Sequence, residues 1–140
     1  AGRGVSAAAI RQKLNIAVPD NLMILGTMKH DELLDCMAAC RVFVMTSKME
    51  GLPTALMEAM ALKKSVVAPD NYGCAEVIGN EKCGFTYKYG SLEDLKEKTL
   101  QAFLDTEKGK KARQRVLENY DWRVVIKQID EVYEKLLQQR

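Results

Sequence analysis

The chain has 140 residues, enough for one domain, and 47% of them are hydrophobic, enough for a buried core. Its formal net charge is only +2 and it carries no RNA- or DNA-binding motif, so we expect no nucleic acid partner. It has no apolar run that could cross a bilayer and no signal peptide. We therefore predict a cytoplasmic protein with a single domain over residues 1–140.

Helices alternate with strands in the first two thirds of the chain. Four short apolar runs predict strands, at residues 22–25, 42–45, 65–68 and 85–89. Helical spacing predicts helices at residues 6–14, 31–39 and 75–78, and a further short helix that ends at residue 62. The helix over residues 31–39 should turn four side chains inward, those of Leu33, Leu34, Met37 and Ala38. Strands that alternate with helices indicate an α/β fold with a parallel sheet.

The remainder of the chain is predicted to be all helical. Ser91 is followed by Asp94 three positions later, the spacing of a helix N-cap. Three helices are expected, over residues 92–104, 107–118 and 122–137. The four cysteines, Cys36, Cys40, Cys74 and Cys83, are read as buried, reduced thiols, because no histidine stands at ligand spacing near Cys36 and Cys40. We expect no metal site.

Two carboxylates stand out in the segment TSKMEGLPTALMEAMAL, residues 46–62. Glu58 is the only charged residue on an otherwise apolar short helix, and such a helix is normally buried. A buried carboxylate needs hydrogen-bond donors, which protein or ligand must supply. Glu50 lies eight residues upstream, on a Gly-Leu-Pro turn directly after an apolar strand. Both carboxylates are therefore expected near the carboxyl end of a strand, where ligands bind in open parallel sheets.

The turn between the two carboxylates has the features of an anion site. Gly51 allows a close approach of backbone to ligand, Pro53 is tolerated at a first helical position, and Thr54 is expected to cap the first turn. Unpaired amides and the dipole at a helix start favour a phosphate. With carboxylates to accept hydrogen bonds from sugar hydroxyls and amides to hold phosphate, the segment suits a nucleotide-sugar.

Residues 47–61, read as S-x-x-E-G-L-P-x-x-L-x-E-A-M-A, resemble the Glu-x7-Glu signature of retaining glycosyltransferases of the GT-B fold, the glycosyl transferases group 1. Residues 21–26, 66–70 and 73–78 also resemble the family's flanking strands and following helix, and the turn at Tyr120 to Trp122 resembles its C-terminal end. The chain departs from the family at Lys63 and Ser65, where Gly and Pro are usual. The resemblance implies a Rossmann-like, partial C-terminal GT-B domain with a helical tail.

By this resemblance Glu50 is the catalytic residue that contacts the transferred sugar, and Glu58 accepts hydrogen bonds from the ribose hydroxyls. Four further donor-binding residues are implied: Gly51, Leu52, Pro53 and Thr54 beside the sugar and diphosphate. Gly26 stands where the family contacts the base. The donor would be a UDP- or GDP-linked sugar, transferred to a glycan, lipid-linked or other hydroxyl acceptor with retained configuration. Cationic side chains and a helix dipole take the place of a metal, and no cofactor is implied.

Several further residues have two interpretations. His30 is either a catalytic base or a surface histidine, and Glu76 either faces the pocket or complements a helix dipole. Lys48 is either a partner of Glu58 or solvated. The basic run Lys108, Lys110, Lys111, Arg113 and Arg115 is either a solvated helix face or a contact with an anionic membrane, which would place the protein at the cytoplasmic membrane face.

The resemblance does not extend over the whole family architecture. The family's cationic Arg and Lys loop has no counterpart, and only Gly2-Arg3-Gly4 matches the end of the next strand. By the family's strand order, central strands and the acceptor domain are absent, and exposed strand edges would favour self-association. We therefore expect the 140-residue chain alone to transfer no sugar. Alternatives are a non-catalytic nucleotide-sugar-binding module, or an epimerase or phosphorylase of the same fold; a phosphorylase's lysine-bound cofactor site is not evident.

Overall fold

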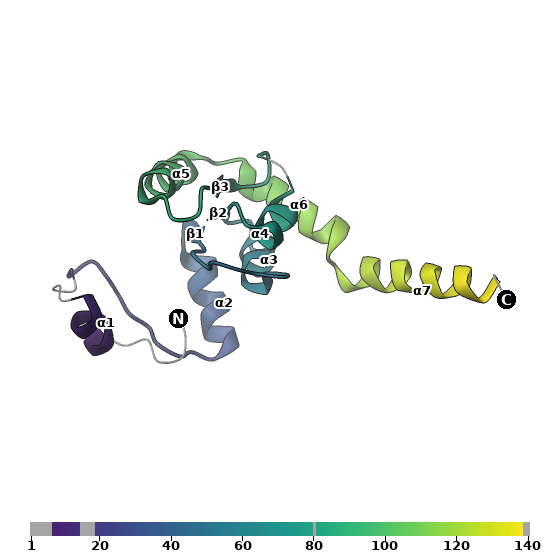
Figure 1. Cartoon of the computed structure of the whole chain (residues 1–140), viewed down its shortest axis with the longest axis horizontal. Helices are drawn as coiled ribbons and strands as arrows, with labels where there is room; N and C mark the ends of the chain where they lie inside the picture. The colour runs from purple at the N-terminus through teal and green to yellow at the C-terminus, as the bar shows by residue number, and fades with distance from the viewer. Residues whose placement is uncertain (1–6, 15–18, 80, 139–140) are drawn as a thin grey trace. The chain divides into compact units, whose positions relative to one another are not determined.

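The computed structural model describes residues 7–14, 19–79 and 81–138 (Figure 1). The chain divides into two units, Ala1–Cys36 and Met37–Arg140, and each is described by itself. The predicted strand end at Gly2, Arg3 and Gly4 lies outside the described residues.

The first unit contains the helix α1, Ala7–Leu14, as the apolar spacing predicts, and the start of α2, His30–Ala39. The predicted strand at residues 22–25 is wrong, because these residues pair with no strand and Leu22, Met23 and Leu25 are exposed. An extended apolar segment becomes a strand only where a neighbour takes up its amides and carbonyls. In the described residues the sheet comprises β1, β2 and β3 alone.

The second unit is built on a parallel sheet of β1 (Val42–Val44), β2 (Ser65–Pro69) and β3 (Phe85–Tyr87), in the order β1-β2-β3. Val67 is opposite Val44 on one side and Phe85 on the other. All five residues of β2 are buried, which explains its continuous apolar sequence: a central parallel strand is covered on both faces. The other three predicted strands are confirmed, with β3 ending at Tyr87 rather than residue 89.

Helices cover both faces of this sheet. On one face α5 (Leu92–Leu104) contacts all three strands, and Val67, Tyr87 and Ala102 form a buried cluster there. On the other face Val66 lies against Gly84, where an added Cβ would come within 2.8 Å of it. The helices α3 (Thr54–Ala61), α4 (Tyr72–Ile78) and α6 (Lys108–Asn119) contact β2, and Figure 1 shows them across the strands from α5. The Rossmann-like α/β prediction is confirmed.

The C-terminal helices also form as predicted. Ser91 caps α5 by accepting a hydrogen bond from the Asp94 amide at 3.2 Å. The last helix, α7 (Trp122–Gln138), has no buried residue, and most of its apolar side chains, including Ile129, Val132 and Leu136, are exposed. One prediction on α2 is wrong: Met37 is buried but Ala38 is exposed. None of the described helices is both long and apolar enough to span a membrane.

The basic run of α6 holds other elements in place. The Arg113 guanidinium donates to the Ala61 carbonyl at the end of α3, and that of Arg115 donates to the carbonyls of Glu76 and Val77 at the end of α4, both at 2.8 Å. The Lys108 ammonium lies 3.6 Å from the centre of the Phe85 ring. The Lys110 ammonium pairs with the Glu107 carboxylate at 3.0 Å. Four of the five basic side chains are thus engaged within the protein, and the two arginines complement the carbonyl ends of helices.

The turn between α3 and β2 is tight although Lys63 stands where the resemblance leads us to expect a glycine. The Lys64 amide donates to the Ala59 carbonyl at 3.0 Å and the Lys63 amide to the Met60 carbonyl at 2.9 Å, the pair of bonds that defines a Schellman helix end. This geometry needs a left-handed residue, and Lys63 has φ 60°. A lysine there is strained, because its Cβ approaches the following carbonyl oxygen.

We predict that Lys63→Gly stabilises the protein by about 0.5–1 kcal/mol, since relief of left-handed strain outweighs the added freedom of the unfolded chain. Urea denaturation of the purified chain measures the difference. Lys96→Gly is the matched control: Lys96 is an exposed residue inside α5, and the same change there should destabilise the protein by about 1 kcal/mol. Destabilisation by both substitutions would contradict the strain at Lys63.

Candidate functional site

Two loops leave the carboxyl edge of neighbouring parallel strands in the second unit. The first follows β1 and runs from Met45 through Glu50 to Pro53, without regular structure. The second, Asp70 and Asn71, follows β2 and leads into α4. Met45 donates its amide to the Val67 carbonyl at 2.9 Å, so the first loop starts in register with the sheet. Carboxyl ends of adjacent parallel strands are where open α/β sheets bind ligands.

Asn71 links the two loops. Its side-chain oxygen accepts from the Cys74 amide at 3.0 Å and so caps α4. Its side-chain nitrogen donates to the carbonyls of Ser47 at 3.1 Å and Lys48 at 3.5 Å, both in the loop that carries Glu50. One planar amide therefore fixes the start of α4 and the backbone that precedes Glu50.

Gly73 brings α4 directly against the backbone of Glu50 and Gly51. A Cβ added at Gly73 would overlap the carbonyl oxygens of both residues, so no side chain fits without a shift of backbone. Gly73 is fully enclosed, whereas Gly51 is exposed and has open space where a Cβ would stand. The close approach therefore depends on the glycine in α4 and not on the glycine of the turn.

The half-buried Glu50 acts electrostatically on the start of α4. Burial raises the pKa of the Cys74 thiol, and the negative charge of Glu50 raises this pKa further. The Cys74 sulfur also lies 3.8 Å from the sulfur of Met45, at the start of the Glu50 loop. The four cysteines are free, and Cys74 and Cys83 are buried as predicted, whereas Cys36 is exposed and Cys40 half-buried.

The start of α3 differs from the predicted cap. Pro53 is the N-cap, one position earlier than expected, and Thr54 is the first helical residue; no side chain caps this end. The Pro53 carbonyl accepts from the amides of Leu56 and Met57. In the described part of the chain no acceptor is found for the amides of Thr54 and Ala55, because they belong to the first turn of the helix. Two donors therefore remain at this end.

Glu58 lies one helical turn beyond Thr54, on the same face of α3. This face is the less enclosed one: Thr54 is exposed and Glu58 is half-buried, whereas Leu56, Ala59 and Met60 on the opposite face are buried. The expected burial of Glu58 is thus only partial. The single carboxylate of α3 therefore lies on the same face of the helix as Thr54, whose amide has no acceptor among the described residues.

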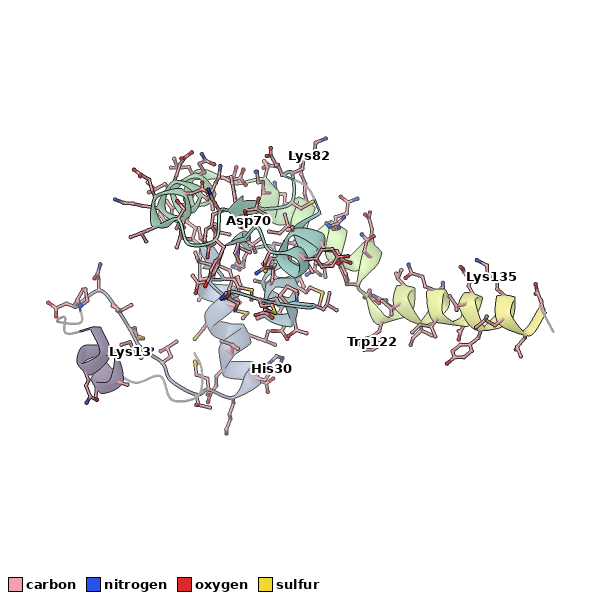
Figure 2. All side chains as sticks on the ribbon, viewed as in Figure 1. Lys13, His30, Asp70, Lys82, Trp122 and Lys135 are labelled. Atoms are coloured by element: carbon pink, nitrogen blue, oxygen red, sulfur yellow. The ribbon has the colours of Figure 1, made fainter. Side chains whose placement is uncertain are left out.

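A pocket of about 250 Å³ opens beside the turn, lined by Leu52, Thr54, Met57, Tyr120, Trp122 and Val125. It joins two predicted donor-binding residues to the start of α7, where Figure 2 labels Trp122. Asp121 orders this corner: hydrogen bonds from the Arg123 side chain lower the pKa of the Asp121 carboxyl below its usual range. The sequence indicates the Tyr-Asp-Trp turn, but nothing in it predicts that these aromatic side chains lie at the site.

The remaining candidates do not line this pocket. Glu76 is exposed in α4, and its carbonyl accepts from Arg115 and, at 3.4 Å, from the Tyr120 hydroxyl. Lys48 is exposed in the Glu50 loop. Gly26, with φ 66°, and His30, the first residue of α2, belong to the first unit. Among the residues the structure describes, no cluster of His, Cys, Asp and Glu could hold a metal ion.

The contact at Gly73 leads to a matched pair of substitutions. Gly73→Ala should lower the free energy of unfolding by about 1–3 kcal/mol, because the new methyl group overlaps the backbone of Glu50 and Gly51. Gly51→Ala should change it by less than about 1 kcal/mol, since its Cβ meets open space. Both changes reduce the freedom of the unfolded chain alike, so urea denaturation isolates the overlap. Equal effects would contradict the close approach.

Comparison with known proteins supplies the family. Residues 2–132 match the family described as Glycosyl transferases group 1. The chain is 31% identical over 111 residues to an N,N'-diacetylbacillosaminyl-diphospho-undecaprenol alpha-1,3-N-acetylgalactosaminyltransferase of Campylobacter jejuni, a match that covers 76% of this chain and 29% of the relative. A sulfoquinovosyl transferase of Arabidopsis thaliana is 36% identical over a match that covers 74% of this chain and 22% of the relative. The chain therefore spans under a third of the length of these relatives.

Solved structures agree on the fold. S. aureus TarM, in complex with fondaparinux, alpha-GlcNAc-glycerol and UDP, superposes with a TM-score of 0.71 at 27% identity, over 94% of this chain and 25% of its own. The Glu50 loop, α3 and α4 all lie within the family match. By the extent of that match, the chain belongs to the glycosyl transferases group 1.

Proposed function

We propose that the second unit binds the nucleotide-sugar donor of a glycosyltransferase that transfers the sugar to an acceptor hydroxyl with retained configuration. The observation that carries this proposal is the start of α3. There the free amides of Thr54 and Ala55 and the carboxylate of Glu58 share one end of a helix at the carboxyl edge of a parallel sheet. Helix amides favour a phosphate, and a carboxylate favours hydroxyl donors.

Each of these residues contacts a different part of the donor in this proposal. The backbone of Gly51, Leu52, Pro53 and Thr54 lies beside the sugar and the diphosphate, Glu58 accepts from the ribose hydroxyls, and Glu50 contacts the transferred sugar. The α3 dipole and its amides stabilise the diphosphate as negative charge develops on it during departure. Membership of the glycosyltransferase family supports this division, as does the UDP bound to the similar TarM.

We propose that another part of the protein binds the acceptor. The Campylobacter relative carries a diphospho-undecaprenol acceptor in its name, and TarM was solved with alpha-GlcNAc-glycerol. A glycan or lipid-linked hydroxyl is thus the acceptor class we propose, with the protein at the cytoplasmic membrane face. Because the chain spans under a third of these relatives, we infer that the 140 residues alone bind donor weakly and transfer no sugar.

Titration calorimetry of the 140-residue chain with UDP and with GDP tests the proposed binding. We expect weak binding of one nucleotide, and Glu58→Gln should weaken it about 10- to 100-fold, because a hydrogen bond to a charged group contributes about 1.5–3 kcal/mol. Glu93→Gln is the matched control: it removes an exposed carboxylate from the first turn of another helix, α5, and should leave the affinity unchanged.

Two results would contradict the proposal. Absence of binding for both nucleotides at millimolar concentration would remove the donor site. An equal loss of affinity in Glu58→Gln and Glu93→Gln would show that only general charge, and not the ribose contact, is involved. A radiolabelled donor assay on the same chain should show no transfer to hydroxyl acceptors, and measurable turnover would overturn the inference that the chain alone is inactive.

A further inference from the structure

The loop that carries Glu50 has little structure of its own. Residues 45–53 form neither helix nor strand, so their backbone is held by contacts with other elements. The segment at Asp70, which precedes Asn71 and lies next to this loop, is held by hydrogen bonds. The Asp70 amide donates to the Tyr87 carbonyl at 2.9 Å, and the Asp70 side chain accepts from the Tyr89 amide at 3.0 Å. Asn71 therefore follows a residue whose backbone bonds to the last residue of β3 and whose side chain bonds to the turn after β3.

The Asn71 side chain uses both ends of its amide. The oxygen caps α4 through the Cys74 amide, which orients the amide plane, and the nitrogen then points at the carbonyls of Ser47 and Lys48. A cap needs only the oxygen. Ser91 shows this on α5, where a hydroxyl accepts from the Asp94 amide at 3.2 Å and serves no loop. Asn71 therefore does something beyond what helix capping requires.

We propose that Asn71 is a positioning residue for the donor site: its side-chain nitrogen holds the backbone at Ser47 and Lys48, so that Glu50 and the following turn face the nucleotide-sugar. Asn71 contacts loop backbone and acts through it, without touching the donor. The effect of Asn71 on donor binding rests on the proposed function. The loop geometry itself is independent of that function.

Two further observations restrict the loop to this position. Gly73 lies against the carbonyls of Glu50 and Gly51 and closes the space on the side of α4. The Tyr87 hydroxyl donates to the Met45 carbonyl at 3.4 Å, where the loop begins. Asn71 acts between these points, at Ser47 and Lys48, where it is the side chain that donates to the loop in the described structure. Loss of its nitrogen would free the middle of the loop while both ends stay held.

Two substitutions separate positioning from capping. Asn71→Asp keeps the shape and the capping oxygen but turns an acceptor toward the Ser47 and Lys48 carbonyls. Asn71→Ser keeps a good capping hydroxyl but has no group that reaches the loop. Ser91→Ala is the control, because it removes a cap of the same kind from α5 and leaves the loop contacts intact.

Hydrogen–deuterium exchange of the purified chain is the first measurement. In both Asn71 variants the amides of residues 47–52 should exchange about three- to tenfold faster, because opening of the loop no longer has to break the hydrogen bond from Asn71 to the loop carbonyls. The α5 and sheet amides should keep their relative protection. In Ser91→Ala the increase should be confined to the start of α5. Loop exchange in either folded Asn71 variant that matches Ser91→Ala would overturn the proposal.

UDP titration is the second measurement. Affinity should fall about three- to tenfold in Asn71→Ser and stay unchanged in Ser91→Ala, since only the first loosens the loop. Faster loop exchange with unaltered affinity would overturn the role of Asn71 in donor binding. If the unsubstituted chain binds neither UDP nor GDP, the donor function fails, while the exchange result still decides whether Asn71 positions the loop.

Discussion

The contact between α4 and the backbone of Glu50 and Gly51 is the constraint on which the candidate site depends. At Gly73 the backbone of α4 and that of the Glu50 loop approach so closely that a methyl group cannot enter. The position of Glu50 is therefore set by a helix that starts after the next strand, and not by the turn in which Glu50 lies. Because β1 and β2 are parallel neighbours, both loops leave the same edge of the sheet, which makes this approach possible.

The elements that bear the site are themselves held by α6. Arg113 and Arg115 donate to the last carbonyls of α3 and α4, groups that a helix leaves without partners. Gly109 lets α6 approach the Lys63 carbonyl, and a Cβ there would overlap that oxygen. The start of α3 has no side-chain cap while its last carbonyl is held by Arg113, so the donor end is left open without loss of support. The basic run thus has an internal function, which its charge pattern did not indicate.

Local sequence signals predicted much of this fold. Apolar runs located β1, β2 and β3, and the Ser91 and Asp94 pair located the start of α5, because these features depend on nearby residues. Predictions failed where distant residues decide the outcome. Residues 22–25 have the composition of a strand but no strand beside them, and Thr54 has a capping hydroxyl but follows the N-cap, Pro53. Lys63 adopts the left-handed conformation that its side chain disfavours, because the Schellman bonds require it.

The sequence also predicted only some of the residues of the candidate site. Leu52 and Thr54, which the sequence singles out, line a pocket, but the contacts of Asn71, Gly73 and Tyr120 join segments far apart in the chain and are visible only in the structure. Asn71 has no local signal that separates it from an ordinary cap. A glycine one residue into a helix can serve packing anywhere, and its partner cannot be read from its neighbours.

Nuclear magnetic resonance of the ¹⁵N-labelled chain during addition of UDP tests most directly whether the free start of α3 receives the diphosphate. The account predicts that the amide signals of Thr54 and Ala55 move most, with smaller shifts at Gly51 and Leu52, and that the α5 amides do not move. UDP binding with the largest shifts elsewhere, and none at Thr54 and Ala55, would contradict it.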